Sequence, residues 1–300
     1  MSEATIPPSC SLAARPSEWS AWNRVLPRVI PLLLAAPLLL YMVVFYALPV
    51  ASMLLRSLND PSWSMDHYAA LLGDVVFLKV FWITLSTSFV VTLSTFVLSY
   101  PVALALSRAR SSAPFILIVI LLPFWTSVLV RSYAWMVLLG RHGLVNEGLL
   151  ALGLLEHPIR LLNTTLATQI AMTHIMMPYM ILPIANALRQ IDPSLALAAS
   201  GLGATPWGVF RQVVLPLSMP GVAVGVLLVF VLALGFYITP ALVGDAREIT
   251  LSMLIANEVD QLHWGYAATL SAVLLATALG LIAIVQFLPG VGNAFRMNLQ

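Results

Sequence analysis

Six long stretches of the chain carry no charged residue, and they constrain the fold more than any other feature. Each holds the ~20 residues that a helix needs to cross a hydrocarbon core of ~30 Å. Across the whole chain, 60% of residues are hydrophobic and 9% are charged, whereas soluble domains contain about 25% charged residues. The sequence therefore predicts an all-α membrane protein. The uncharged stretches are residues 29–55, 80–107, 111–130, 161–188, 212–244 and 261–295.

These stretches divide the chain into a membrane domain and two tails. We expect a cytoplasmic N-terminal tail over residues 1–28, a transmembrane domain over 29–290 and a cytoplasmic C-terminal tail over 291–300. Charged residues interrupt the N-terminal tail, which is not the pattern of a signal peptide, so we expect an uncleaved first helix. The expected spans are 29–55, 80–107, 113–139, 162–188, 217–243 and 266–289.

The placement of charges predicts the orientation of these six spans. An even number of spans puts both termini on one side, and that side carries eight basic and three acidic residues. The other side carries six basic and nine acidic residues. Basic residues gather in the cytoplasmic loops of membrane proteins. We therefore predict a multi-pass protein of the bacterial inner membrane with both termini in the cytoplasm. The net charge of +2 is too small to indicate a nucleic-acid partner.

The sequence lacks the motifs of several enzyme classes. The single lysine, Lys79, does not follow a glycine, so the phosphate-binding pattern GxxxxGK[ST] is absent. The patterns HExxH and GxSxG are absent as well. Cys10 is the single cysteine, which excludes an intrachain disulfide, and the five histidines show no ligand spacing. We expect no catalytic residue, metal site or cofactor in this chain.

The most informative segment is the polar interruption between the fourth and fifth spans, DPSLALAASGLGATPWGVFRQVVLPLSMPG, at residues 192–221. It resembles the EAA loop of permease subunits of ABC importers, whose pattern is EAA-x₃-G-x₉-I-x-LP. The glutamate of that pattern falls on Leu197. An amphipathic hairpin at the membrane surface is the alternative interpretation. The coupling residues that the resemblance implies are Leu197, Ala198, Ala199, Gly203, Ala204, Val213, Leu215 and Pro216.

This resemblance implies the fold of a type I ABC importer permease with a cytoplasmic coupling-helix loop over residues 193–216. In that family the loop forms two short helices that dock into a cleft of a separate ATPase subunit. Gly203 would let the chain turn between the helices, because glycine accepts a positive φ at little steric cost. Without the glutamate, docking would depend on shape and on Arg189, Asp192 or Arg211.

A second block narrows the resemblance. Residues 123–153 resemble the PFWxSxLVRxYAWxxLLxxxGxxN block of the spermidine/putrescine-type permeases. The segments 46–58 and 239–245 match that family as well, so the resemblance covers about residues 30–290. It implies that the solute is a polyamine or a related nitrogenous compound. The matched residues of the block are Pro123, Trp125, Ser127, Arg131, Tyr133, Trp135, Gly143 and Asn146.

A polyamine is a flexible polycation, which carboxylates and aromatic faces bind with ~0.5–2 kcal/mol per contact. The acids among our candidates can equally form a solvated loop face or a docking surface for a binding protein, and the tryptophans can be interfacial anchors. Arg131 needs a partner or water if it lies inside the membrane, and Glu147 is a candidate counter-charge. An arginine there can also indicate a carboxylate-bearing solute. The pathway candidates are Trp125, Arg131, Tyr133, Trp135, Tyr237, Asp245, Glu258 and Asp260.

The resemblance also implies the partners of the chain. They are two ATP-binding subunits that hold ATP and Mg, a second homologous permease subunit, which makes a heterodimer, and a periplasmic solute-binding protein. The membrane lipid surrounds the complex. A stand-alone secondary transporter or channel is the alternative, but it would show an inverted repeat and titratable residues deep in the spans, and we see neither. An importer permease for an amino-acid-like compound or an anion is a further alternative.

Overall fold

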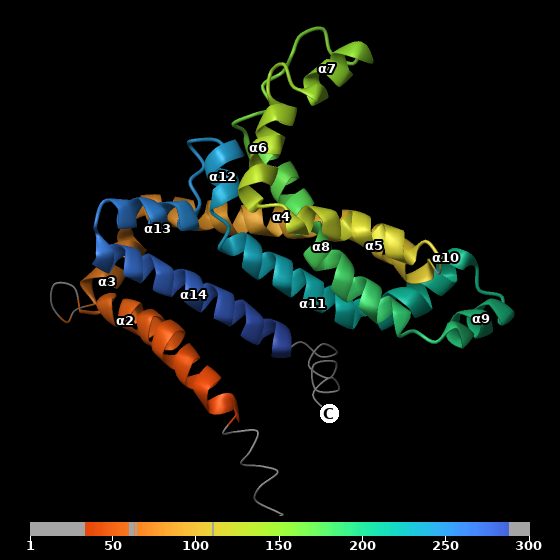
Figure 1. The fold of residues 1–300 in the computed structure, drawn as a ribbon, viewed down its shortest axis with the longest axis horizontal. Helices are drawn as coiled ribbons and strands as arrows, with labels where there is room; N and C mark the ends of the chain where they lie inside the picture. Colours follow the sequence, from red (N-terminus) through yellow and green to blue (C-terminus); the bar gives the residue numbers. More distant parts are fainter. Residues whose placement is uncertain (1–33, 60–62, 64, 110, 288–300) are drawn as a thin grey trace, which may run out of the picture. The chain divides into compact units, whose positions relative to one another are not determined.

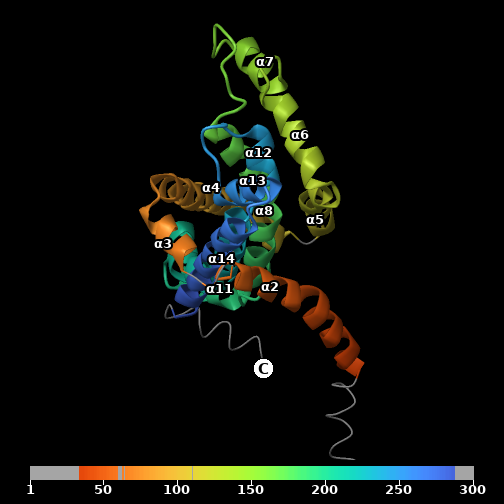
Figure 2. The same cartoon turned by 90° about the vertical axis from the view of Figure 1, so that its left-hand side faces the viewer.

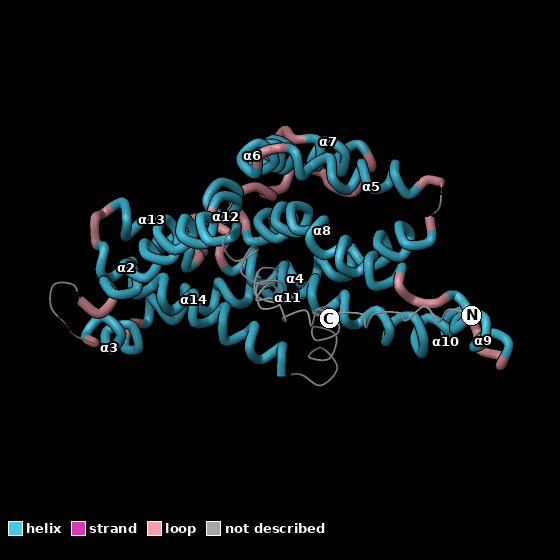
Figure 3. The backbone as a smooth tube through the Cα atoms, turned by 60° about the horizontal axis from the view of Figure 1, so that its bottom comes forward, coloured by secondary structure: helices cyan, strands magenta, loops and turns pink. Residues whose placement is uncertain are grey.

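The computed structural model describes residues 34–59, 63, 65–109 and 111–287. Within these ranges the chain forms helices joined by short loops and contains no β-strand (Figure 3). The predicted all-α class is therefore confirmed. The tails predicted over 1–28 and 291–300 lie outside the described residues, as do the first five residues of the first expected span.

The chain divides into two units, of which the first ends at Leu55. Its described part belongs to a single helix that runs from Leu34 to Arg56, the first residue of the second unit. A π-helical segment, η1 (Val43–Ala47), interrupts its α-helical hydrogen bonding, and α2 (Leu48–Arg56) follows. Its large apolar side chains are exposed around the whole helix. A helix that is apolar on every side is typical of a membrane span.

The second unit, residues 56–300, contains the other helices and is built around three of them. α4 (Val75–Arg108), α8 (Thr165–Arg189) and α11 (Leu215–Leu234) pack against one another (Figure 1). On α4 the buried face carries small hydroxyl residues, and these bond to their own helix; the Thr95 hydroxyl, for example, donates to the Val91 carbonyl over 2.6 Å. Small side chains let helices approach closely in a membrane. The buried residues of α8 on this core include Met172, Met176, Met180, Ile181 and Ile184.

The third expected span, 113–139, is not one straight helix. α5 (Ala113–Leu121) leads through a 3₁₀ turn, η2 (Leu122–Trp125), into α6 (Val128–Leu139). The helical segments before and after this break are inclined by 96°, and Figures 1 and 2 show the change of direction. Pro123 has no N–H to continue the helix, and the Ser127 side chain starts α6 by accepting a hydrogen bond from Leu129 N at 3.2 Å.

The remaining helices are short elements between spans, with one exception. α3 (Asp66–Gly73) precedes α4, α7 (Leu144–Ala151) follows α6, and α12 (Ile238–Val243) and α13 (Leu251–Asp260) follow α11. The exception is the last span, α14 (Trp264–Phe287). In the described part of the chain, five helices are long and apolar enough to cross a membrane, and the bent pair raises this number to six.

Several boundaries of the spans differ from those that the charges indicated. α4 begins at Val75, five residues before the expected start, because the Asp74 side chain accepts a hydrogen bond from Val76 N at 2.8 Å and caps the helix. Lys79 therefore lies inside α4, near its N-terminal end, where a long side chain can extend to the membrane–water interface. The expected fifth span, 217–243, is not one helix, because α11 ends at Leu234 and a separate helix, α12, follows it.

Candidate functional site

The polar loop between the fourth and fifth spans begins with a capped short helix, α9 (Pro193–Gly201). The Asp192 carboxylate accepts a hydrogen bond from Ser194 N at 2.8 Å, and this bond lowers the pKa of Asp192. Gly203 ends the helix with φ = 88°, and Ala204 N donates to the Ala199 carbonyl over 3.1 Å. The left-handed conformation of Gly203 explains why the pattern has glycine at this position.

The second part of the loop is continuous with the fifth span. Thr205 caps α10 (Pro206–Val209) by accepting a hydrogen bond from Gly208 N at 3.2 Å. A π-helical segment, η3 (Phe210–Val214), then joins α10 to α11, so that one helix runs from Pro206 to Leu234. The loop therefore contains one free short helix, whereas the second of the two expected short helices is the first part of a membrane span.

The eight predicted coupling residues differ in their exposure. Leu197, at the position of the glutamate in the pattern, is 72% exposed. It belongs to a group of exposed apolar side chains, which we call the loop surface and define as Leu195, Leu197, Leu202 and Trp207. Exposed large apolar side chains of this kind are candidates for contact with another protein. Of the other predicted residues, Ala198, Gly203 and Pro216 are exposed, and Ala199, Ala204, Val213 and Leu215 are half-buried.

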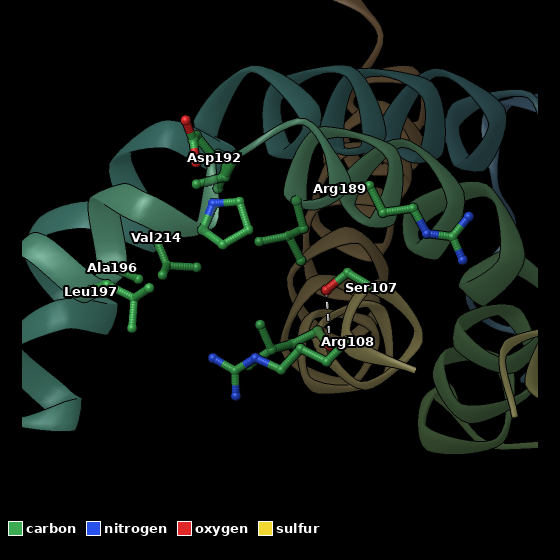
Figure 4. A pocket seen from close by; sticks show the side chains of 11 residues that line it. Ser107, Arg108, Arg189, Asp192, Ala196, Leu197 and Val214 are labelled. Atoms are coloured by element: carbon green, nitrogen blue, oxygen red, sulfur yellow. Dashed lines mark hydrogen bonds between the residues drawn. The ribbon is translucent and has the colours of Figure 1, made fainter. Parts of the chain in front are cut away.

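A cleft of about 510 Å³ separates α9 from the C-terminal ends of α4 and α8 (Figure 4). Arg108 and Arg189 both line it, and Figure 4 shows their side chains pointing in opposite directions. Arg189 donates to the Leu106 carbonyl over 3.3 Å, which satisfies an acceptor in the last turn of α4. Arg189, Asp192 and Arg211, the three charges expected to support docking, are all exposed, and the first two also form the hydrogen bonds described above.

Aromatic residues connect the loop to the second span. Trp207 stacks on Phe210 with ring centroids 5.3 Å apart, and Phe210 meets the edge of Tyr100 on α4 at 5.7 Å. The Tyr100 hydroxyl forms a 2.9 Å hydrogen bond with Ser218 Oγ of α11. The sequence-based interpretation did not include these residues. The available signal was the spacing of Trp207 and Phe210, which puts both on one face of a helix.

Two of the pathway candidates lie together in a polar cluster between α6 and α8. Trp135 Nε1 donates to His174 Nδ1 over 3.4 Å, and the two rings are 5.6 Å apart. Arg131 lies one turn earlier on α6, and Tyr179 of α8 contacts Phe124, just before that helix, with ring centroids 5.4 Å apart. We call Arg131, Trp135, His174 and Tyr179 the arginine cluster. Other aromatic candidates are exposed instead, namely Trp125 (88%), Tyr133 (51%) and Tyr237 (43%).

Two of the three candidate carboxylates make local interactions in the structure. Asp245 accepts a hydrogen bond from Arg247 N at 2.9 Å in the turn after α12. Glu258 pairs with His263 at 2.9 Å beyond the end of α13. Asp260 is exposed at the C-terminal end of the same helix. Among the described residues, no three His, Cys, Asp or Glu side chains are grouped in a way that could hold a metal ion.

A bundle of spanning helices with a loop of short helices between the fourth and fifth of them is typical of a permease subunit of an ABC importer. The family model "Binding-protein-dependent transport system inner membrane component" matches residues 81–288. The chain belongs to this family. Its members are inner-membrane transport components and not enzymes, and they function with an ATPase and a periplasmic binding protein.

Individual proteins agree with this assignment. The chain is 33% identical over 229 residues to the spermidine/putrescine transport system permease protein PotB of Haemophilus influenzae, covering 76% of this chain and 75% of that protein. A crystal structure of a bacterial ABC transporter involved in the import of alginate, an acidic polysaccharide, superimposes with a TM-score of 0.73 at 20% identity, covering 93% and 98% of the two chains. A second structure, of the alginate transporter in complex with a periplasmic protein, gives a TM-score of 0.71 at 18% identity and covers 88% and 95%. These similarities confirm the importer permease fold.

Proposed function

We propose that the chain forms part of the pathway through which an ABC importer carries a polyamine, or a related nitrogenous solute, into the cell. The observation that carries this proposal is the 33% identity to a spermidine/putrescine permease over three quarters of both chains. The residues of the 123–153 block support it. The aromatic candidates of this block can offer faces to ammonium groups, with ~0.5–2 kcal/mol per contact.

The partners follow from the same assignment. We infer that two ATPase subunits, which bind ATP and Mg, receive the loop surface and that a periplasmic protein delivers the solute. A second, homologous permease subunit would complete the pathway. The loop surface supports the ATPase contact, since full burial of a leucine side chain contributes about 1.5–3 kcal/mol. With the glutamate of the pattern replaced by Leu197, apolar contact rather than an ion pair would hold this position.

We also propose that both termini lie in the cytoplasm, as the charge distribution indicates. Cys10 is the single cysteine of the chain and belongs to the predicted N-terminal tail, so it can report the orientation without any mutation. A membrane-impermeant maleimide should label Cys10 in inside-out vesicles and leave it unlabelled in intact spheroplasts. Labelling in intact spheroplasts would reverse the proposed orientation.

The solute is tested with the full complex of this chain, its partner permease, the ATPases and the binding protein, reconstituted in liposomes. Spermidine or putrescine should stimulate ATP hydrolysis and accumulate in the lumen. ATP-dependent accumulation of another solute, without response to either polyamine, would refute the polyamine assignment. Accumulation by the chain alone, without the ATPases, would refute the importer assignment.

The role of the loop is tested with two glycines of the same segment. Gly203→Ala should reduce solute-stimulated ATP hydrolysis, because a side chain at φ = 88° costs roughly 1–2 kcal/mol and disfavours the observed turn. Gly201→Ala is the matched control, since Gly201 lies two residues earlier in α9 and a Cβ there would meet no atom within 4 Å. If the two variants show equal solute-stimulated ATP hydrolysis, the turn at Gly203 has no role in docking.

A further inference from the structure

Within the described part of the chain, no acidic side chain pairs with the guanidinium of Arg131. Its Nε and Nη1 atoms are buried and have no hydrogen-bond partner among the described residues. Neither Glu147, which is exposed on α7, nor any other acidic side chain in the described part of the chain forms an ion pair with it. A buried charge is retained in a protein where something pairs with it or solvates it.

The neighbours of Arg131 place this charge deep in the membrane. α8 has 25 residues, which makes it about 37 Å long. Its two members of the arginine cluster, His174 and Tyr179, lie about 14 Å and 21 Å from its outer end. Arg131 lies between Phe124, whose ring contacts Tyr179, and Trp135, which bonds to His174, so it lies beside the middle turns of α8. An ionisable residue at this depth indicates a functional site.

The arginine cluster supplies no negative charge. The indole of Trp135 is a donor only, so His174 Nδ1 accepts its hydrogen bond and carries no proton in this arrangement. The imidazole is then neutral, and its hydrogen-bond acceptor is occupied by Trp135. Tyr179 has its ring centroid 5.4 Å from that of Phe124, on the 3₁₀ turn before α6. The surroundings of Arg131 are therefore aromatic and neutral.

We propose that a carboxylate binds Arg131 in the assembled importer and that the solute or the second permease subunit provides it. The planar guanidinium presents parallel N–H donors that match the two oxygens of a carboxylate. This inference rests on the proposed function, in which the chain lines a solute pathway. A polyamine has no carboxylate, so a polyamine importer needs the carboxylate of the partner permease. An amino-acid-like solute has a carboxylate of its own that can bind Arg131.

The test uses the complete complex in nanodiscs and two probes of equal chain length, 1,4-diaminobutane and 4-aminobutanoate. The variants are Arg131→Lys, which keeps the charge but loses the forked donor geometry, and Arg131→Gln. Arg141→Gln is the matched control, because Arg141 is exposed in the turn after α6. Binding of each labelled probe is measured without the binding protein, and the recovery of the second permease with this chain is measured by affinity purification.

If the solute provides the carboxylate, we expect the variants to change the selectivity between the two probes. Arg131→Gln should then weaken 4-aminobutanoate binding about tenfold or more, and Arg131→Lys severalfold, because a charge-assisted forked pair is lost. The binding of 1,4-diaminobutane and the recovery of the second permease should stay within about twofold of the control. A carboxylate from the partner predicts the opposite pattern, in which both variants lower the recovery of the second permease and leave the ratio of the two affinities unchanged.

The proposal is overturned if Arg131→Lys behaves like Arg141→Gln in both measurements. This outcome is decisive even if Arg131→Gln fails to fold, because lysine retains the charge and tests the carboxylate geometry alone. A wild-type complex that carries no solute would instead refute the proposed pathway. The two failures are therefore distinguishable.

Discussion

The packing of α11 on α8 depends on two glycines that are one helical turn apart. A Cβ built on Gly221 would lie 2.5 Å from Ala187 Cβ and 2.6 Å from the Pro183 carbonyl oxygen. A Cβ on Gly225 would meet the Met180 sulfur at 2.8 Å. The obstacles at Gly221 are a backbone oxygen and a side chain without rotamers, whereas a methionine side chain can rearrange. Gly221→Ala should therefore be the more destabilising change.

The magnitude follows from two opposing terms. Extra volume in a close-packed interface destabilises by about 1–3 kcal/mol, while alanine favours a helix over glycine by ~1 kcal/mol. We expect Gly221→Ala to lower the free energy of unfolding by about 1–2 kcal/mol, since its clash is with the backbone. Gly225→Ala should change it by less than about 1 kcal/mol, because the methionine can adapt.

The matched control is Gly280→Ala on α14, where a Cβ would meet no atom within 4 Å. This variant should be as stable as the wild type, or up to ~1 kcal/mol more stable. The assay is unfolding in mixed micelles, followed by far-ultraviolet circular dichroism against denaturant concentration. If Gly221→Ala unfolds at the same midpoint as Gly280→Ala, close approach at Gly221 does not hold α11 to α8, and the reasoning fails.

Three further predictions concern hydrogen bonds. Tyr100→Phe should destabilise the subunit by only about 0.5–1.5 kcal/mol in the same unfolding assay, because Ser218 still donates to a carbonyl of its own helix over 2.9 Å. The hydrogen bond from Ser194 N lowers the pKa of Asp192. The helix cap should therefore be fully formed at pH values above the normal carboxyl range and be lost as the pH falls through the lowered pKa. Amide exchange in α9, corrected for the intrinsic rate, should accelerate over that fall in pH. The buried Asn146 amide donates two hydrogen bonds to backbone carbonyls, and a carboxylate cannot replace them, so Asn146→Asp should lower the unfolding free energy by about 2–4 kcal/mol. An unchanged midpoint for Asn146→Asp would contradict this role.

The loop was predictable because its geometry is encoded locally. The Asp192 and Thr205 side chains start their helices by hydrogen bonds within three residues. Gly203 is the residue of this loop that adopts the left-handed backbone conformation. Turn chemistry of this kind is fixed by residue type and spacing, so the motif and the structure agree. The continuity of α10 with α11 was not predictable, since nothing between Phe210 and Val214 signals either a break or a π-helical segment.

The block at residues 123–153 suggested a solute pathway, but part of it has a structural role. A Cβ on Gly143 would lie 2.4 Å from the carbonyl oxygens of Val137 and Leu138, so only glycine fits this turn. Asn146 is fully buried and ties the residues around Ile159 to the end of α6 through three hydrogen bonds of 3.0–3.1 Å. Sequence spacing cannot separate such a turn from a binding site, because both require particular residues at fixed positions.

The bend before α6 and the unpaired Arg131 depend on tertiary structure. Pro123 marks a possible break, yet prolines also lie inside α4, α8 and α11 without ending these helices. The bend after Pro123 differs from these continuous helices because Thr126, three residues after this proline, adopts an extended conformation with ψ = 144°. Whether an arginine in a span finds a counter-charge depends on which helices pack beside it, and composition does not encode that.

The continuity of the loop with a membrane span has a mechanical consequence for the proposed function. The helix from Pro206 to Leu234 has 29 residues and is about 43 Å long. Trp207 lies near its N-terminal end on the loop surface, and the close contact with α8 at Gly221 lies about 21 Å further along. Because Phe210 and Ser218 both contact Tyr100, we expect a displacement of the loop in the proposed function to move the first part of α11 together with α4. The π-helical segment between them is where such a helix would yield first, since its hydrogen bonds are irregular.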